Sequence, residues 1–154
     1  MGIEIERKFL VTGDGWRNGA RTVRCKQGYL AVGPPVSVRV RIMDGEAMLN
    51  IKQSTLNISR AEYEYSIPVA EAEELLASID QNTVVEKTRS FVAYGGKTWE
   101  VDEFLGANAG LIVAEIELDD RDEAFDRPPW LGEEVSGDGR YLNSSLSRRP
   151  FTTW

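Results

Sequence analysis

Apolar and polar residues alternate along most of this sequence, with the period of two that is typical of β-strands. The pattern predicts eight strands, over residues 3–11, 22–32, 36–43, 47–54, 59–69, 84–94, 97–104 and 111–118. Turn sequences such as Asp44-Gly45 and Gly95-Gly96 separate several of them, and such short connections favour antiparallel hairpins. We therefore expect an all-β or β-rich fold, either a barrel or a sandwich.

Helical patterns are few. Residues 71–79 carry apolar side chains at helical spacing and acids in the first turn, and residues 141–148 form a weaker second candidate. Trp16 is expected on a short turn or helix between the first two strands. The 154 residues contain no internal repeat or linker, so we expect a single domain over residues 1–154.

Several function classes are excluded by composition. The 18 Lys and Arg against 25 Asp and Glu leave a net charge of −7, which argues against non-specific binding to nucleic acid or an anionic membrane. Histidine is absent, which excludes Ser-His-Asp and Cys-His catalysis and His-ligated zinc. No P-loop or dinucleotide-binding glycine turn occurs. Chemistry is left to carboxylates, lysine, arginine, tyrosine and a metal bound through oxygen ligands.

The cysteine content and the hydropathy predict where the protein is found. The sequence has one cysteine, Cys25, no apolar run long enough to span a membrane, and charges where a signal peptide needs an apolar centre. Proteins with this cysteine usage belong by default to reducing compartments. We therefore expect a cytoplasmic protein without a membrane partner.

Same-sign charges recur two residues apart on strand after strand. The pairs are Glu4 and Glu6, Arg39 and Arg41, Glu62 and Glu64, Lys87 and Arg89, Glu100 and Asp102, and Glu115 and Glu117, with Lys8 and Lys52 as additional cations. Residues i and i+2 of a strand share a face, and like charges roughly 7 Å apart repel by about 2 kcal/mol at an effective dielectric constant of about 20. Apolar residues fill much of the opposite face.

One such pair is explained by a strand face exposed to solvent. Six pairs are harder to explain this way, because protein surfaces usually intersperse opposite charges. They favour strands that curl into a barrel with the charged face inside, where acids hold divalent cations and basic residues hold an anion. The eight acids and six cations give this face a charge of −2, which one or two divalent cations would make suitable for a polyanion.

The same residues resemble the CYTH superfamily, the triphosphate tunnel metalloenzymes. The opening Glu4-Ile5-Glu6-Arg7-Lys8 is similar to the family's ExExK signature. The resemblance continues in order through the later charge pairs to the segment from Gly137 to Asn143. It implies an eight-stranded antiparallel barrel whose charged tunnel binds triphosphate compounds together with Mg²⁺ or Mn²⁺.

The resemblance also assigns roles by position. The main metal ligands would be Glu4, Glu6, Glu115 and Glu117, with Asp102, Glu62 and Glu64 completing a second site or orienting basic residues. The phosphate-binding residues would be Lys8, Arg39, Arg41, Lys52, Lys87 and Arg89, and Arg140 would either join them or form a structural salt bridge. Tyr29 could point inward beside Lys8 and, with a cationic neighbour to lower its pKa, act as a base; packing and a hydrogen bond are its alternatives. The catalytic candidates are Lys8, Tyr29, Glu6 and Glu117.

The resulting hypothesis is a metal-dependent hydrolase that cleaves inorganic triphosphate to pyrophosphate and phosphate. A class IV-type adenylyl cyclase and a thiamine triphosphatase are alternatives within the family, and a non-catalytic polyphosphate- or nucleotide-binding module is an alternative from another class. The short chain leaves little material for a nucleoside or thiazole pocket, which favours the inorganic substrate. The preferred metal and the oligomeric state, a homodimer included, stay open.

Overall fold

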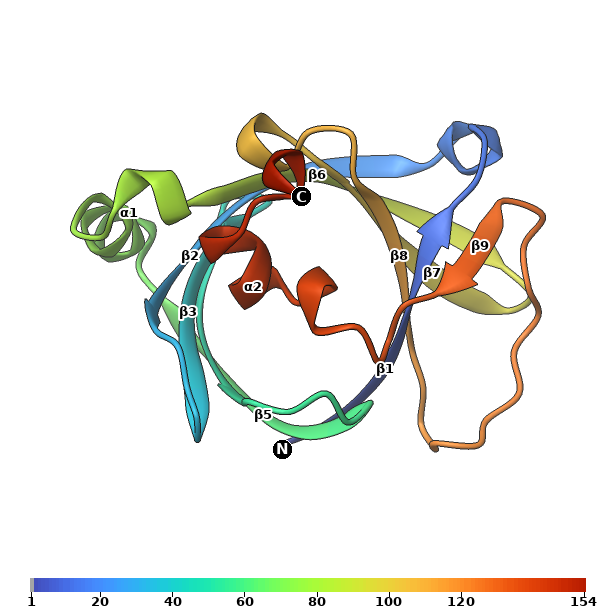
Figure 1. Cartoon of the computed structure of the whole chain (residues 1–154), viewed down its shortest axis with the longest axis horizontal. Coiled ribbons are helices and arrows are strands. Elements are labelled where there is room, and N and C mark those ends of the chain that lie inside the picture. Colours follow the sequence, from blue (N-terminus) through green and yellow to red (C-terminus); the bar gives the residue numbers. More distant parts are fainter. Residues whose placement is uncertain (1) are drawn as a thin grey trace.

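The computed structural model describes residues 2–154, which form nine strands, two α-helices and five short 3₁₀ turns (Figure 1). The strands are β1 (Ile3–Val11), β2 (Arg21–Ala31), β3 (Val36–Met43), β4 (Glu46–Gln53), β5 (Ser59–Ile67), β6 (Val85–Tyr94), β7 (Lys97–Phe104), β8 (Ile112–Glu117) and β9 (Leu131–Glu134). The helices are α1 (Val69–Ala77) and α2 (Asn143–Arg148). None of the helices in this range is long and apolar enough to cross a membrane.

Eight of the strands close into an antiparallel barrel. Their order is β5-β4-β3-β2-β6-β7-β8-β1, and β1 pairs back with β5. The closing contact is short, because β1 and β5 share three register pairs, Ile3–Ala61, Glu4–Arg60 and Ile5–Ser59. The expected eight-stranded antiparallel barrel is therefore confirmed, and the sandwich alternative is wrong.

Strand β9 is an addition that the sequence pattern did not predict. It pairs with β1 beside the barrel, with Phe9 opposite Glu134 and Val11 opposite Leu131. Its four residues include Gly132 and do not alternate, so periodicity gives no signal for it. The pairing depends instead on the long loop after β8, which brings this segment back to β1.

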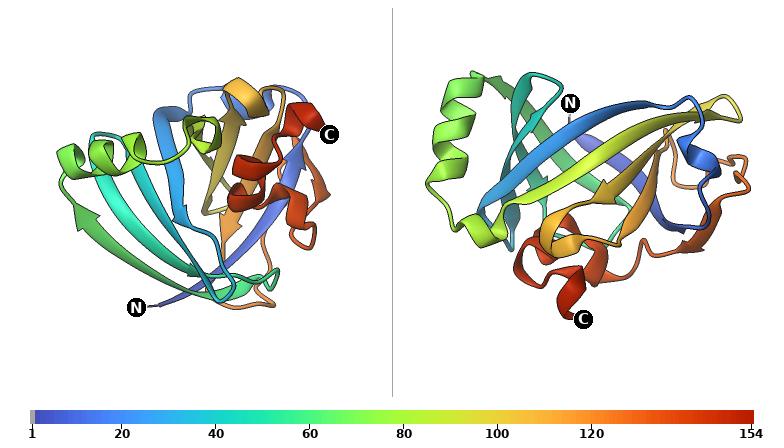
Figure 2. Two further views of the ribbon diagram at one scale, coloured as in Figure 1. Left: turned by 60° about the vertical axis from the view of Figure 1, so that its left-hand side comes forward. Right: turned by 90° about the horizontal axis from the view of Figure 1, so that it is seen from above.

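The apolar side of the sheet faces outward, and other parts of the chain cover much of it, while Ile3, Tyr63 and Tyr65 of β1 and β5 stay exposed. Helix α1 lies outside the barrel (Figure 2), where Ala72 and Leu76 pack on Val40 and Ala47. The helix begins at Val69, two residues earlier than predicted, because Pro68 occupies the position before its first turn. A second outer cluster contains Phe9, Trp16, Trp99 and Trp130, with Trp16 on the expected short turn.

Inside the barrel, one end is apolar and the rest is polar, with many charged side chains. Val85, Phe104 and Val113 pack there with Tyr141 and Leu146 of the C-terminal segment. Helix α2, whose first turn the sequence placed two residues early, lies across this end and is seen within the ring of strands in Figure 1. Lys87, Asp102 and Glu115 each stand two residues from one of these apolar residues on the same strand, after Val85 on β6, before Phe104 on β7 and after Val113 on β8, so the charged positions begin directly beside the apolar layer.

Candidate active site in the barrel interior

The charged part of the interior is a cavity of about 580 Å³. Its lining includes seven carboxylates, Glu4, Glu6, Glu62, Glu64, Glu100, Glu115 and Glu117. It also includes seven cations, Arg39, Arg41, Lys52, Arg60, Lys87, Arg89 and Arg148. The lining is therefore balanced in charge and does not carry the expected charge of −2, because Arg60 and Arg148 join it while Lys8 and Asp102 lie outside it.

The two signs are separated around the barrel. All seven acids come from β7, β8, β1 and β5, which are neighbours in the sheet; we call them the acidic wall. Five of the cations, Arg39, Arg41, Lys52, Lys87 and Arg89, come from β4, β3 and β6 on the opposite arc and form the basic wall. A polyanion bound between the walls would contact guanidinium and ammonium groups on one side and any metal ion held by carboxylates on the other.

Two arginines of the basic wall have no carboxylate partner. Among residues 2–154, no carboxylate oxygen lies within 4.0 Å of a nitrogen of Arg39 or Arg41. Arg39 is buried, and Nε of Arg41 is buried without a hydrogen-bond partner in the same range. Burial, followed by the positive charges of Arg39 and Arg89, lowers the pKa of Arg41. Because buried unpaired charges are costly, this arrangement indicates a site for an anion.

The acidic wall brings like charges together across β1 and β8. Glu6 is the register partner of Glu117, and Glu115 is the register partner of both Lys8 and Glu100. The pKa of Glu117 is raised, first by burial and then by the charges of nearby glutamates, Glu4 and Glu6 among them. Carboxylates crowded in this way are the hard oxygen ligands that Mg²⁺ and Mn²⁺ prefer, so the donor set fits a divalent cation.

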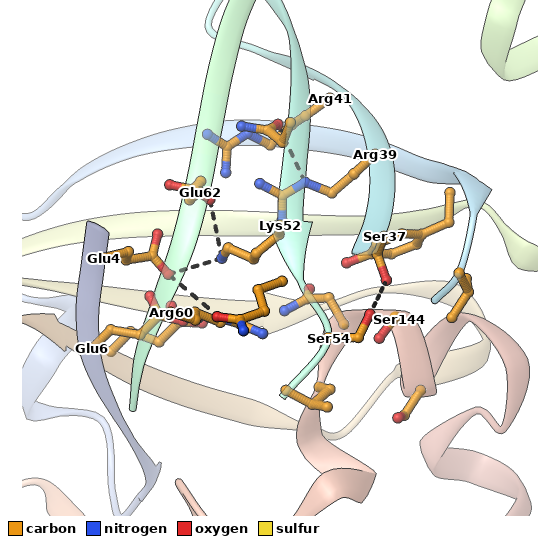
Figure 3. A pocket seen from close by; sticks show the side chains of 18 of the residues that line it. Glu4, Glu6, Ser37, Arg39, Arg41, Lys52, Ser54, Arg60, Glu62 and Ser144 are labelled. Carbon is orange, nitrogen blue, oxygen red and sulfur yellow. Dashed lines mark hydrogen bonds and ion pairs between the residues drawn. The ribbon is translucent and has the colours of Figure 1, made fainter. Parts of the chain in front are cut away.

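Side-chain cations neutralise part of the acidic wall in this structure. Lys52 Nζ lies 2.9 Å from Glu4 Oε1 and 3.2 Å from Glu62 Oε2, and Arg60 Nη2 lies 3.6 Å from Glu6 Oε1 (Figure 3). Within the described part of the chain, no three acidic side chains already converge on one point as a metal cage. The carboxylates are thus gathered on one wall, and Glu4, Glu6 and Glu62 form ion pairs with Lys52 and Arg60 there.

Asp102 lies behind the cavity lining and holds two members of the basic wall. It is 1% exposed, its Oδ2 lies 2.8 Å from Lys87 Nζ, and it accepts two hydrogen bonds from Arg89 at 2.8 and 2.9 Å. Burial alone would raise its pKa, but Lys87 and Arg89 outweigh burial and lower it. Arg89 also donates to Glu100 at 2.5 Å. Of the two roles that the resemblance implies for Asp102, this geometry matches the orientation of basic residues.

Comparison of the sequence with known protein families and proteins shows which family the chain belongs to. The sequence profile of the CYTH domain matches residues 2–149. The chain belongs to the CYTH domain family. A protein of Acetivibrio thermocellus named inorganic triphosphatase is 49% identical over 151 residues, covering 98% of this chain and 97% of that protein. One of Nitrosomonas europaea with the same name is 39% identical over 150 residues, covering 94% and 96%.

A solved structure of a CYTH protein supports the same conclusion. The crystal structure of the inorganic triphosphatase NE1496 aligns with a TM-score of 0.68 and 36% identity, covering 94% of this chain and 93% of that one. The family that the ExExK motif and the order of charge pairs indicated is thereby confirmed, together with its barrel.

Three residues that the CYTH resemblance placed at the site have other neighbours here. Lys8 does not line the main cavity; its Nζ donates to the Tyr141 carbonyl at 3.1 Å and lies 3.9 Å from Glu115 Oε1. Arg140 is exposed and paired with Asp138 at 2.8 Å, so the structure does not bring it to the cavity. Tyr29 lines the cavity, but its register partner is Arg39, and this is its cationic neighbour on the adjacent strand.

Other residues that line the cavity of this CYTH barrel were not predicted from the sequence. Arg60 stands two residues before Glu62 on the same strand face, but a search for same-sign pairs passes over it. Asn143 of α2 accepts hydrogen bonds from Gln27 and Lys87 at 2.8 and 3.1 Å, and thus ties the helix to the barrel wall. The remaining missed residues are mainly neutral, Ser37, Asn50, Ser54, Thr55, Ser144 and Ser145, and no charge pattern marks them.

Proposed function

We propose that this protein hydrolyses inorganic triphosphate to pyrophosphate and phosphate with the help of a divalent metal ion, Mg²⁺ or Mn²⁺. The observation that carries the proposal is a pair of arginines, the buried Arg39 and the half-buried Arg41, which have no carboxylate partner within residues 2–154 and face the acidic wall across the cavity. Two relatives named inorganic triphosphatase, at 49% and 39% identity, support the choice of substrate.

The basic wall would bind and orient the phosphate chain. Guanidinium groups such as those of Arg39 and Arg41 bind phosphoryl oxygens in a bidentate manner. Lys87 and Arg89 are held from behind by Asp102, so their positive charges are fixed before the substrate binds. Phosphoryl transfer depends mainly on positioning and on the neutralisation of charge, and this wall supplies both.

The acidic wall would hold the metal. Glu6, Glu115 and Glu117 are the proposed ligands because they come from adjacent strands, and Glu4 is available next to them. When bound, a divalent ion neutralises phosphate charge and lowers the pKa of bound water. Tyr29, beside Arg39 on the facing wall, is proposed to donate a hydrogen bond to the substrate or to act as a base there.

The neutral end of the cavity argues against substrates with a large organic part. Among the described residues that line the cavity, Tyr29 is the one aromatic side chain, and the α2 end offers hydroxyls such as those of Ser37, Ser54 and Ser144. A nucleobase or thiazole ring would therefore find a single aromatic side chain, Tyr29, and no pair of rings between which to stack. We therefore rank adenylyl cyclase and thiamine triphosphatase activity below hydrolysis of the inorganic chain.

One assay tests the proposal against its alternatives. The protein is incubated with inorganic triphosphate, ATP or thiamine triphosphate, with Mg²⁺ or Mn²⁺, while phosphate, pyrophosphate and cyclic AMP are measured. We expect phosphate and pyrophosphate in equal amounts from inorganic triphosphate, and slower or no reaction with the other two. Formation of cyclic AMP, faster turnover of thiamine triphosphate, or binding without any turnover would each overturn the proposal.

We further propose that residues 1–154 act as one domain in the cytoplasm. The CYTH match extends over residues 2–149, and the single cysteine, Cys25, is buried. A reducing compartment is the usual place for such a protein.

A further inference from the structure

Asn50 lies between two opposite charges in a row of side chains that crosses three strands. The register pairs Arg39 of β3 with Asn50 of β4, and Asn50 with Glu64 of β5. All three line the cavity, and Asn50 is 1% exposed. Its Oδ1 accepts from Arg39 Nε at 3.4 Å, and its Nδ2 donates to Glu64 Oε1 at 3.0 Å.

The chemistry of these contacts explains why an amide stands here. An amide accepts on one side and donates on the other without carrying a charge. An aspartate would pair with Arg39 but repel Glu64, and a lysine would do the reverse. A serine is too short to reach both neighbours across strands about 4.8 Å apart.

The amide also separates two charges that would otherwise attract each other. Arg39 and Glu64 stand two strands apart, with backbones about 10 Å from each other, a gap that an extended arginine and glutamate can span. No ion pair joins them, and within residues 2–154 no other carboxylate reaches Arg39 either. Arg89, which has no such neutral neighbour between it and the acids, is paired with both Asp102 and Glu100.

We infer that Asn50 is a positioning residue that holds the Arg39 guanidinium through Nε and keeps it from pairing with Glu64. The two terminal nitrogens of Arg39 then remain available for the oxygens of a phosphate chain. The inference deepens the proposed function and rests on it for the identity of the anion.

The test measures the dissociation constant of inorganic triphosphate by calorimetry in EDTA, so that no turnover occurs, together with the melting temperature. N50D places a carboxylate beside Arg39, and we expect affinity to fall by about tenfold or more, because a charge-assisted pair now occupies the guanidinium. N50A removes the spacer, and we expect a loss of about fivefold, as Glu64 becomes free to pair with Arg39.

A double-mutant cycle separates this role from a merely structural one. E64Q removes the competing charge, so N50A should cost less than about twofold when it is introduced into the E64Q variant. In the metal-loaded enzyme, N50A should raise KM more than it lowers kcat. If N50D fails to fold, the double-mutant cycle between N50A and E64Q still tests whether Asn50 keeps Arg39 from pairing with Glu64.

The outcomes also distinguish this inference from the proposed function. Equal losses from N50A with and without E64Q, or a folded N50D that binds triphosphate like the wild type, overturn the role of Asn50 and leave hydrolysis standing. A wild-type protein that binds triphosphate but releases no phosphate overturns the proposed function and leaves the role of Asn50 standing. A wild-type protein that binds triphosphate neither in EDTA nor with Mg²⁺ or Mn²⁺ overturns both.

Discussion

Glu6 of β1 and Glu117 of β8 are direct register partners, and both line the cavity. Burial and the neighbouring negative charges raise the pKa of Glu117. Two acids held in this way repel each other unless a cation lies between them. Their placement is the reason to locate the metal on this part of the acidic wall.

Replacement of these acids should abolish metal-dependent turnover. We expect E6Q and E117Q each to lower kcat for inorganic triphosphate by about 100-fold or more, since that factor corresponds to about 2.7 kcal/mol, within what a bound metal contributes. Phosphate release measures the effect. E73Q, an exposed position on α1, is the matched control and should retain full activity. Unchanged turnover in E6Q or E117Q would remove that residue from the metal site.

We expect Arg41 to lower the stability of the ligand-free protein and to contribute to triphosphate binding. Burial and the charges of Arg39 and Arg89 lower its pKa, and its Nε has no partner in the described chain. R41M keeps the apolar stem, so we expect the free energy of unfolding without ligand to rise by about 1 kcal/mol. Triphosphate affinity should fall by about tenfold. Urea denaturation and calorimetry test the two effects, and a less stable R41M with unchanged affinity would contradict this account.

Asp102 should matter for stability at neutral pH. D102N leaves Lys87 and Arg89 buried with a neutral partner, so we expect unfolding to become easier by about 3–5 kcal/mol. Chemical denaturation at pH 7 measures this, with D122N in an exposed loop as the control. A D102N protein as stable as the wild type would show that the buried pairs contribute nothing.

The lowered pKa of Asp102 predicts how its contribution to stability depends on pH. Lys87 and Arg89 lower the pKa of folded Asp102, so its contribution to stability is complete above the unfolded pKa, near 4, and is lost as the pH falls toward the lower folded value. The stability difference between wild type and D102N should therefore be constant from pH 7 to about 5 and shrink below pH 4. A difference that grows on acidification would contradict the lowered pKa.

Removal of the metal should stop the reaction without unfolding the barrel. Lys52 lies between Glu4 and Glu62, and Arg60 lies near Glu6, so these acids keep cationic partners when no metal is bound. With EDTA we expect phosphate release to cease while circular dichroism is unchanged. Loss of the β-sheet spectrum in EDTA would show that the metal holds the fold together.

Arg140 should have little effect on catalysis. It pairs with Asp138 at the surface, and its guanidinium lies over the ring of Trp154. We expect R140A to change KM for triphosphate by less than about twofold, because exposed pairs contribute little. A much larger rise in KM would mean that this residue reaches the substrate after all.

The sequence predicted the barrel and most of the charged interior because both depend on local periodicity. Charge pairs such as Arg39 and Arg41 share a strand face wherever the strand lies, so their common direction follows from spacing alone. The inward direction also followed, since six like-charged pairs are costly on an ordinary surface. Burial within one cavity then confirmed it.

What could not be predicted depends on neighbours that are far apart in sequence. Asn50 carries no charge, and its position between Arg39 and Glu64 follows from strand register. Arg60 meets Glu4 only because β5 closes the barrel against β1. Lys8 belongs to the ExExK motif, yet its ammonium group donates a hydrogen bond to the Tyr141 carbonyl of the C-terminal segment. Such contacts are fixed by tertiary packing, which a pattern along the chain does not report.

The most direct test of the central claim is a crystal structure with a non-hydrolysable triphosphate analogue and Mn²⁺. The account predicts the analogue inside the barrel, with phosphoryl oxygens on Arg39 and Arg41 and a metal ion on the side of Glu6 and Glu117. An analogue bound on the outer surface, or a metal held away from the acidic wall, would contradict it.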